Sequence, residues 1–330
     1  MPSDFANIQR TGEPAVPARL FGWGMLAVLF AYMVNNVLVV GFGMPGVKPL
    51  FSGAAGGAAW VNAAVYAASI TVAVLFVLRT PGNALRWDAM TIHRFNTYLI
   101  RAAFWTVLFV GIVDSAIAFM RVEGILAAIF AEDTVKLFSK ARWVGPYIHI
   151  PLVFAGLVVA GFTRTLGFTW LALMIVAAEL LIVISRFVFS YEQALMGDLV
   201  RYWYAALFLF ASAYTLFEEG HVRVDVLYAG FGRTTRGFVN AFGAIALGMS
   251  TVWVILIVGL NGKTAIINSP IVNFEISQAG GVGMFIKYQM AAFLAIFATT
   301  MLIQFVSYFL EAVADKRDEP GHREIAPAAH

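Results

Sequence analysis

Ionisable residues inside apolar stretches are the first candidates for chemistry in this sequence of 330 residues. Arg101, Asp114, Glu179 and Arg186 each lie within a stretch that is otherwise apolar. A charge in the interior of a bilayer is costly, so such residues usually bind ions, transfer protons or pair with one another. For Asp114 we favour a structural pairing across helices, with Arg186 or with a polar residue. The alternative is a coupling-ion or proton role.

Other polar residues in the apolar stretches are expected to have structural roles. Glu179 and Arg186 are seven residues apart, which places both on one face of a helix, about 10 Å apart along its axis. They are too far apart for a direct ion pair, although they could flank one partner. Asn35 and Asn36 in the first stretch, and Gln304 in the last, are expected to join helices by hydrogen bonds.

The sequence contains few residues that could bind a cofactor or a metal, or act in catalysis. It contains no Cys, which excludes disulfides, thiolate metal sites and iron–sulfur clusters. His149 begins a predicted helix, where it could ligate haem, but His93 and His221 fall in predicted loops and provide no second ligand. No Gly-x-Ser-x-Gly nucleophile motif occurs, and the intramembrane acids lack catalytic spacing. We therefore expect no metal, no cofactor and no enzyme activity.

The densest polar cluster lies at residues 218–228 and reads Glu-Glu-Gly-His-Val-Arg-Val-Asp-Val-Leu-Tyr. It separates an aromatic-rich apolar stretch at 202–217 from a longer apolar stretch at 238–260. Taken as composition, the cluster is typical of an interfacial connector that obeys the positive-inside rule. We expect a short loop between two membrane-spanning helices.

The elements that must position these residues are membrane helices. Hydrophobic residues make up 61% of the sequence and charged residues only 12%, a composition typical of a polytopic membrane protein. The apolar stretches are near twenty residues long, unlike the ten-residue alternating strands of membrane barrels. We predict an all-α integral membrane protein with about eight transmembrane helices. Their expected ranges are 20–42, 56–78, 98–120, 145–163, 167–189, 202–217, 237–260 and 286–310.

Lys and Arg are modestly enriched in the segments that face the cytoplasm when the amino terminus is placed there. This predicts two cytoplasmic termini, with residues 1–19 retained and residues 314–330 forming a tail without a fixed fold. We interpret the scattered cations as topology signals and expect contact with lipid but not with nucleic acid. The placement of the loop 121–142 stays open, because it combines mixed charges with an apolar piece suited to the interface.

The fourth and fifth apolar stretches are separated by only three residues, Arg164 to Leu166. They form either a tight hairpin of two spans or one kinked span with an interfacial piece.

The order of residues in the 218–228 cluster is more informative than its composition. Gly220-His221-Val222-Arg223-Val224-Asp225 resembles the signature of the small permease subunit of tripartite ATP-independent periplasmic (TRAP) transporters, the DctQ type. The likeness covers about residues 168–314, four of the eight expected spans. Further residues follow the order of the family: Arg186-Phe187-Val188-Phe189, Asp198-Leu199, Glu275-Ile276-Ser277, Gly280-Gly281, Lys287 and Gln304.

The sequence departs from the family pattern at two places. Asp198 stands where the family usually has Glu, and the proline often found soon after Lys287 is missing. The resemblance nevertheless implies a DctQ-like four-helix domain at 166–313, preceded by an N-terminal membrane extension of about four helices at 20–165. The extension has no second His-x-Arg-x-Asp motif, and its role is open.

The resemblance also implies a function. Small subunits of this family are scaffolds in the bacterial inner membrane beside a large permease subunit, and a periplasmic binding protein delivers the substrate. Uptake is driven by a sodium gradient, and the substrates are mostly organic acids. The sequence does not name the substrate, because recognition in the family lies on the other two components.

Within the signature we expect Arg223 and Asp225 to pair with each other or with neighbouring helix ends, while His221 braces the turn. With Arg186 and Asp198 these residues form the expected assembly motif. One alternative is a stand-alone secondary transporter in which the intramembrane acids handle ions, which the lack of matched interrupted helices disfavours. The other is a membrane anchor of another complex, which the missing Cys and unsuited His disfavour.

Overall fold

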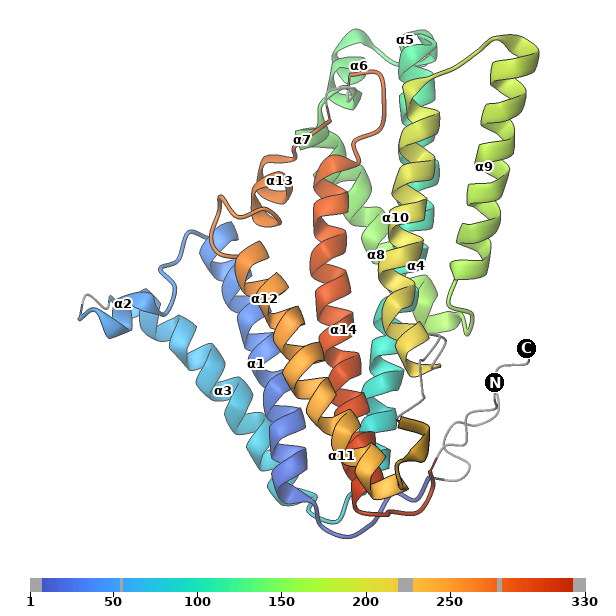
Figure 1. Ribbon diagram of the computed structural model, residues 1–330. Coiled ribbons are helices and arrows are strands. Elements are labelled where there is room, and N and C mark those ends of the chain that lie inside the picture. Colours follow the sequence, from blue (N-terminus) through green and yellow to red (C-terminus); the bar gives the residue numbers. More distant parts are fainter. Residues whose placement is uncertain (1–7, 54–55, 219–227, 278–280, 323–330) are drawn as a thin grey trace. The chain divides into compact units, whose positions relative to one another are not determined.

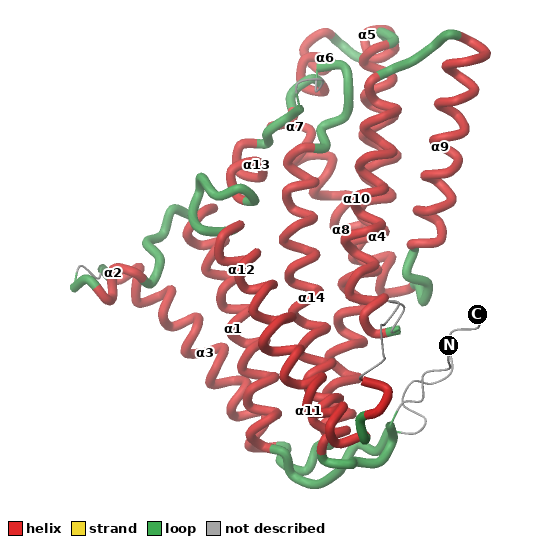
Figure 2. The backbone as a smooth tube through the Cα atoms, in the orientation of Figure 1, coloured by secondary structure: helices red, strands yellow, loops and turns green. Residues whose placement is uncertain are grey.

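The computed structural model describes residues 8–53, 56–218, 228–277 and 281–322. Over these ranges the protein is helical, without a β-sheet, as predicted, and one isolated bridge pairs Thr11 with Asn83. Eight helices in the described ranges are long and apolar enough to cross a membrane, which confirms the predicted number of spans (Figure 1 and Figure 2). The cytoplasmic location of the termini stays a prediction.

The eight spans begin and end close to the predicted ranges, except that α10 begins eight residues before 202 and α4 begins earlier still than predicted. Six are formed by α1 Val16–Gly41, α3 Gly57–Arg79, α4 Leu85–Val122, α9 Phe168–Phe189, α10 Ala194–Phe217 and α14 Lys287–Lys316. The other two each contain a π-helical segment: α7 Ala141–Val144, η1 Gly145–His149 and α8 Ile150–Phe162; and α11 Arg233–Gly243, η3 Ala244–Met249 and α12 Ser250–Gly259. The shorter helices are α2 Lys48–Phe51, α5 Ile125–Ile129, α6 Glu132–Phe138, η2 Tyr228–Gly230 and α13 Asn268–Asn273.

The largest departure is that of α4, which begins thirteen residues before the expected start near 98. Its 38 residues extend about 57 Å at 1.5 Å per residue, whereas the hydrocarbon core of a bilayer is about 30 Å thick. The polar side chains of its first turns have buried partners: Asp88 binds Arg19, and His93 contacts Gln304. The prediction that His93 lies in a loop was wrong, because average hydropathy does not register polar residues that are paired inside a fold.

Residues 163–167 connect α8 and α9, and both helices have the length of a full span. Of the two alternatives for this region, two separate spans are therefore present. Gly167 has a φ of +84°, a backbone conformation that glycine adopts without strain. This glycine allows the chain to leave the short connection directly into α9.

The chain forms two compact units. Unit 1 comprises the described residues of 1–96, 215–263 and 301–330. Unit 2 comprises the described residues of 97–214 and 264–300. Each unit combines residues from the predicted N-terminal extension with residues from the predicted DctQ-like domain. The boundary near 165 stays a prediction about sequence families.

In unit 1, helix α1 contacts α3, α12 and α14. The Asn35 amide donates to the backbone oxygen of Asn62 on α3, at 3.3 Å, and the Tyr32 hydroxyl donates to that of Leu256 on α12, at 3.1 Å. Gly22 leaves room for Leu310 of α14, whose side chain lies 3.2 Å from the position of a Cβ. The expected interhelical role of Asn35 is therefore confirmed.

A buried ion pair joins the start of α1 to the start of α4 in unit 1. Arg19 Nε lies 2.7 Å from Asp88 Oδ2, and both side chains are almost completely buried. The Trp23 indole donates to the same carboxylate oxygen at 2.7 Å, and the Arg19 guanidinium also donates to the hydroxyl and the carbonyl of Thr80. Because every polar group in this cluster has partners, the charges are tolerated without water.

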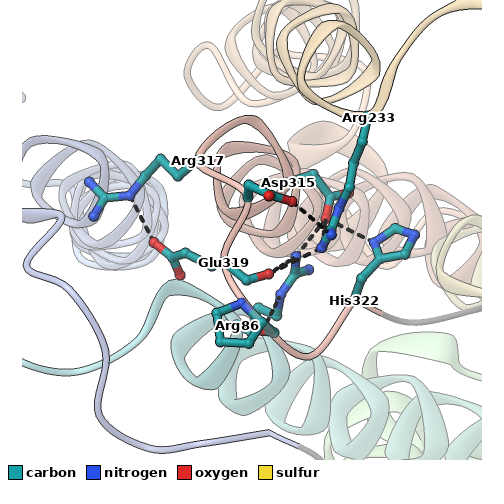
Figure 3. A network of polar contacts seen from close by, with 8 residues as sticks. Arg86, Arg233, Asp315, Arg317, Glu319 and His322 are labelled. Atoms are coloured by element: carbon teal, nitrogen blue, oxygen red, sulfur yellow. Dashed lines mark hydrogen bonds and ion pairs between the residues drawn. The ribbon is translucent and has the colours of Figure 1, made fainter.

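The residues after α14 are held by a network of ion pairs in unit 1 (Figure 3). Arg86 of α4 donates to Asp315 at 2.6 Å and to the backbone oxygen of Glu319 at 3.1 Å, and Arg233 of α11 pairs with Asp318 at 2.8 Å. Further pairs are Arg317 with Glu319 and His322 with Asp315. The network holds the described part of the expected tail, 314–322, and the expectation for 323–330 stays a prediction.

In unit 2, two glycines of the N-terminal extension allow close helix crossings. A Cβ on Gly156 of α8 would lie 2.7 Å from the backbone nitrogen of Thr106 on α4. A Cβ on Gly111 of α4 would lie 2.1 Å from the indole nitrogen of Trp203 on α10. Small residues at crossings are the usual means of bringing membrane helices into van der Waals contact.

We expect Gly156→Ala to destabilise the protein by about 1–3 kcal/mol, because the added methyl group meets backbone that cannot move aside easily. Gly161→Ala in the same helix is the matched control, since nothing lies within 4 Å of a Cβ there. The control should be neutral or stabilising by up to about 1 kcal/mol. Thermal unfolding in detergent checks both, and equal midpoints for the two variants would contradict the close crossing.

Candidate functional site

The segment before α14 is held by two buried carboxylates in unit 2. Asp198 Oδ2 on α10 accepts a hydrogen bond from the backbone N–H of Met284 at 3.0 Å. Asp114 Oδ2 on α4 accepts from the next N–H, that of Phe285, at 2.8 Å. These donors lie outside the helix, and Met284 and Phe285 are fully buried, so the carboxylates satisfy N–H groups that water does not reach.

An arginine completes the contacts to this segment. The Arg121 guanidinium, near the end of α4, donates to the backbone oxygen of Gly283 and to that of Phe138. Its carbon Cζ also lies 4.8 Å from the centre of the Phe285 ring, within the range of a cation–π contact. Three successive residues, 283–285, are thus bound through their backbone by side chains of α4 and α10.

His149 extends the cluster to η1. Its Nε2 lies 3.3 Å from Asp114 Oδ1, and its Nδ1 lies 3.0 Å from the amide nitrogen of Gln289 on α14. The Gln289 amide oxygen accepts from the Tyr202 hydroxyl, so its nitrogen is the donor toward Nδ1. We infer that Nδ1 is an acceptor, whereas the contact of Nε2 with Asp114 does not have the geometry of a hydrogen bond. The Tyr288 hydroxyl also contacts Nδ1.

We call Asp114, Arg121, His149, Asp198 and Gln289, with the bound segment 283–285, the polar clamp. Four described elements contribute to it: α4, η1, α10 and α14. Both carboxylates have local partners, since Arg201 lies 2.9 Å from Asp198 Oδ1 and Asp114 accepts the hydrogen bond from Phe285. Chemically, this arrangement fixes backbone geometry, and no group of three metal-ligating side chains occurs in the described residues.

An exposed ion pair lies on the approach to the clamp. Glu275 Oε2 is 2.8 Å from Lys287 Nζ at the start of α14, and the Ser269 hydroxyl donates to the other Glu275 oxygen at 2.9 Å. The hydrogen bond from Lys287, and then that from Ser269, lower the pKa of Glu275 below its ordinary value of 4.5. The pair connects the loop after α13 to the last helix.

A comparison with protein families finds a match for the region that contributes to most of these contacts. Residues 174–314 match the family described as tripartite ATP-independent periplasmic transporters, DctQ component. We call residues 174–314 the DctQ segment, after the family that they match. No match was found among curated proteins or among solved structures. The family consists of transporter components rather than enzymes, and an N-terminal region that is also helical precedes the segment.

Five residues are expected to form the assembly motif. The structure describes two of them, Asp198 and Arg186. Asp198 is buried and belongs to the polar clamp. Arg186 is mostly exposed near the end of α9 and lies 3.5 Å from Glu192. His221, Arg223 and Asp225 lie outside the described residues.

The expected intramembrane charges have different surroundings. Asp114 pairs with the polar residue His149 rather than with Arg186, so the second of its two expected partners is the one observed. Arg101 donates to the backbone oxygens of Ala160 and Thr163, at 3.2 and 2.7 Å, where it caps the carboxyl end of α8. Glu179 is exposed on α9.

Sequence reasoning missed Arg121, Tyr202 and Gln289 as site residues. From the sequence, Arg121 belongs to a loop of mixed charges and Tyr202 begins an aromatic-rich stretch, while Gln289 follows Lys287 without a distinguishing pattern. A usable signal was the presence of polar residues at helix ends: Asp198, Gln289 and Arg121 each lie within a turn or two of an end. His149 was considered only as a haem ligand, and its observed partners are Asp114, Tyr288 and Gln289.

We expect Asp114→Asn to destabilise the protein by about 1–3 kcal/mol, because the amide removes the charge facing His149 and turns one acceptor oxygen into a donor. Glu179→Gln is the matched control, since it makes the same chemical change at an exposed position of α9. The control should change stability by less than about 0.5 kcal/mol. Equal unfolding midpoints in detergent for the two variants would argue against the polar clamp.

The Glu275 and Lys287 pair predicts a pH dependence. Since the folded-state pKa of Glu275 is lowered, the pair stabilises the fold above the ordinary pKa of 4.5 and loses this effect as the pH falls through the lowered value. The midpoint difference between wild type and Glu275→Gln should therefore be largest near neutral pH and disappear in acid. Glu132→Gln, in a more exposed pair with Lys136, is the control with a smaller difference. A difference that is constant with pH would contradict this assignment.

Proposed function

We propose that this protein is the small membrane subunit of a TRAP-type secondary transporter in a bacterial inner membrane. In this role it supports a large permease subunit that takes up an organic acid, driven by a sodium gradient. A periplasmic binding protein delivers the substrate to the complex. The match of residues 174–314 to the DctQ component is the observation that carries the proposal.

The residue order of the signature supports the same assignment. His221, Arg223 and Asp225 follow α10 with the spacing of the family, and Asp198 precedes them where the family has an acidic residue. Asp198 binds the backbone of Met284, so the acidic residue has a structural task in this chain. An Asp in place of Glu is shorter by one methylene group and requires the bound segment to lie close to α10.

The surroundings of the polar residues favour a scaffold over a conduit. Asp114, Asp198 and Arg101 are each engaged with backbone groups of their own unit. A translocation path requires polar groups that face a cavity and exchange partners with an ion or a substrate. A subunit that widens the stationary part of a transporter instead needs apolar faces and fixed helix ends.

We propose a topology in which both termini are cytoplasmic. Residues 1–19 then form a cytoplasmic segment, residues 20–165 a membrane extension, residues 166–313 the DctQ-like domain, and residues 314–330 a cytoplasmic tail. The ion-pair network around Arg86 and Asp315 supports this arrangement, because charges gather at helix ends that face water. Lys and Arg at those ends follow the positive-inside rule.

A stand-alone secondary transporter is the alternative function. It would use Asp114 and Glu179 for ion coupling. The two residues differ in surroundings, since Asp114 is buried among hydrogen-bond donors and Glu179 is exposed on α9. Uptake of an organic acid by the purified chain alone in liposomes would favour this alternative over the proposed subunit. A third possible function is that of a membrane anchor in another complex. Bound haem in the absorption spectrum of the purified protein would favour that function.

We expect Arg223→Ala and Asp225→Ala to weaken assembly with the large subunit. Loss of one partner of the signature leaves the other charge uncompensated, and about a tenfold lower recovery of the complex corresponds to roughly 1.4 kcal/mol of association free energy. Co-purification with the co-expressed large subunit measures this effect, and uptake of the organic acid should fall in parallel.

Glu218→Ala is the matched control for both variants, because it removes an exposed charge next to the signature but outside it. It should leave assembly and uptake near the wild-type level. Full assembly and full uptake in both signature variants would overturn the proposed assembly role of the loop.

A further inference from the structure

A cavity of about 410 Å³ lies between α4, α9 and α10 in unit 2. Its wall is formed mainly by apolar side chains and by two serines, including Ser115 and Phe119 of α4, Ala178, Leu181 and Ser185 of α9, and Leu195 of α10. The volume is within the range of sites that hold small molecules, about 300–1,000 Å³. None of the side chains of the polar clamp lines this space.

The surroundings determine what can fill the cavity. Its walls belong to three membrane spans, and α9 has the highest mean hydropathy and the smallest buried share of the eight spans among the described residues. Phe119 and Leu181 line the cavity and are also exposed on the surface of the unit. The medium around an exposed membrane span is lipid hydrocarbon. An acyl chain therefore reaches the cavity directly, and its dispersion contacts replace those that an empty space would lack.

Charges of both signs lie near one end of the cavity. Tyr191, which lines it, donates a hydrogen bond to Glu123, and Gln193 donates to the same carboxylate oxygen. Arg186 follows the lining residue Ser185 and lies 3.5 Å from Glu192. The hydrogen bond from Tyr191 to Glu123 raises the pKa of Tyr191 to about 12, so this phenol stays a donor at physiological pH.

We propose that the cavity binds one acyl chain of a zwitterionic phospholipid, phosphatidylethanolamine, as an integral part of unit 2. The phosphate lies at Arg186, and the ammonium group lies at Glu123 and Glu192. A cation with nearby carboxylates complements a headgroup that carries both charges, whereas the same carboxylates repel a purely anionic headgroup. Binding selectivity arises from the headgroup, because the surrounding lipid is as apolar as the cavity.

The test is native mass spectrometry of the full-length protein in detergent, titrated with phosphatidylethanolamine and, in parallel, with phosphatidylglycerol. We expect wild type to retain one phosphatidylethanolamine with higher affinity than phosphatidylglycerol. Ala178→Trp fills the cavity and should lower the affinity at least about tenfold. Ala177→Trp is the matched control, because this neighbour on α9 is exposed but does not line the cavity, and it should bind like wild type.

A second variant keeps the cavity open. Arg186→Gln should reduce the preference for phosphatidylethanolamine over phosphatidylglycerol while the unfolding midpoint stays unchanged, because Arg186 is mostly exposed. Equal binding by Ala178→Trp and wild type would overturn the acyl-chain site, and equal affinities for the two lipids would overturn the headgroup assignment. Loss of the lipid upon assembly with the large subunit would also overturn the proposal, since the cavity would then receive a helix of that partner.

Discussion

Backbone N–H and C=O groups that are buried away from water must find partners inside the protein, and in a bilayer this constraint is strict. Helices meet it by themselves, but the residues before α14 are not helical. Their N–H groups are satisfied by two carboxylates, Asp198 and Asp114, and the Gly283 carbonyl is satisfied by Arg121. The start of α14 is therefore fixed by side chains of α4 and α10.

The same principle explains most of the charges that are unusual in a membrane sequence. Arg101 binds the last carbonyls of α8, and Arg19 binds Asp88 and Thr80. Replacing a buried pair by apolar residues is often neutral, whereas removing one partner is strongly destabilising. Such residues therefore specify which helix ends meet, more than they add to the net stability. Glu179 and Arg186 differ from this group because both are exposed on α9.

The N-terminal extension and the DctQ segment share both compact units. In unit 2, Asp114 and His149 come from the extension, while Asp198 and Gln289 come from the DctQ segment. In unit 1, Arg86 from the extension binds Asp315, directly after the DctQ segment. Several polar groups of the DctQ segment therefore have their partners in the extension: the Phe285 N–H, the Gly283 carbonyl and the Gln289 amide.

The sequence by itself determined the fold class, the number of spans and most of their bounds. These follow from the apolar stretches, because hydropathy and the length needed to cross a bilayer are local properties. The order of residues around Arg223 also indicated the DctQ family, which the match of residues 174–314 confirmed.

Only the tertiary structure decided which polar residues meet. Asp114 and Phe285 are separated by 171 residues and Arg86 and Asp315 by 229, and no local pattern encodes such pairings. For the same reason hydropathy missed the first turns of α4, whose polar side chains are paired with distant residues. Partner choice in a helical membrane protein depends on where helix ends converge, which is a property of the packed fold and not of any single segment.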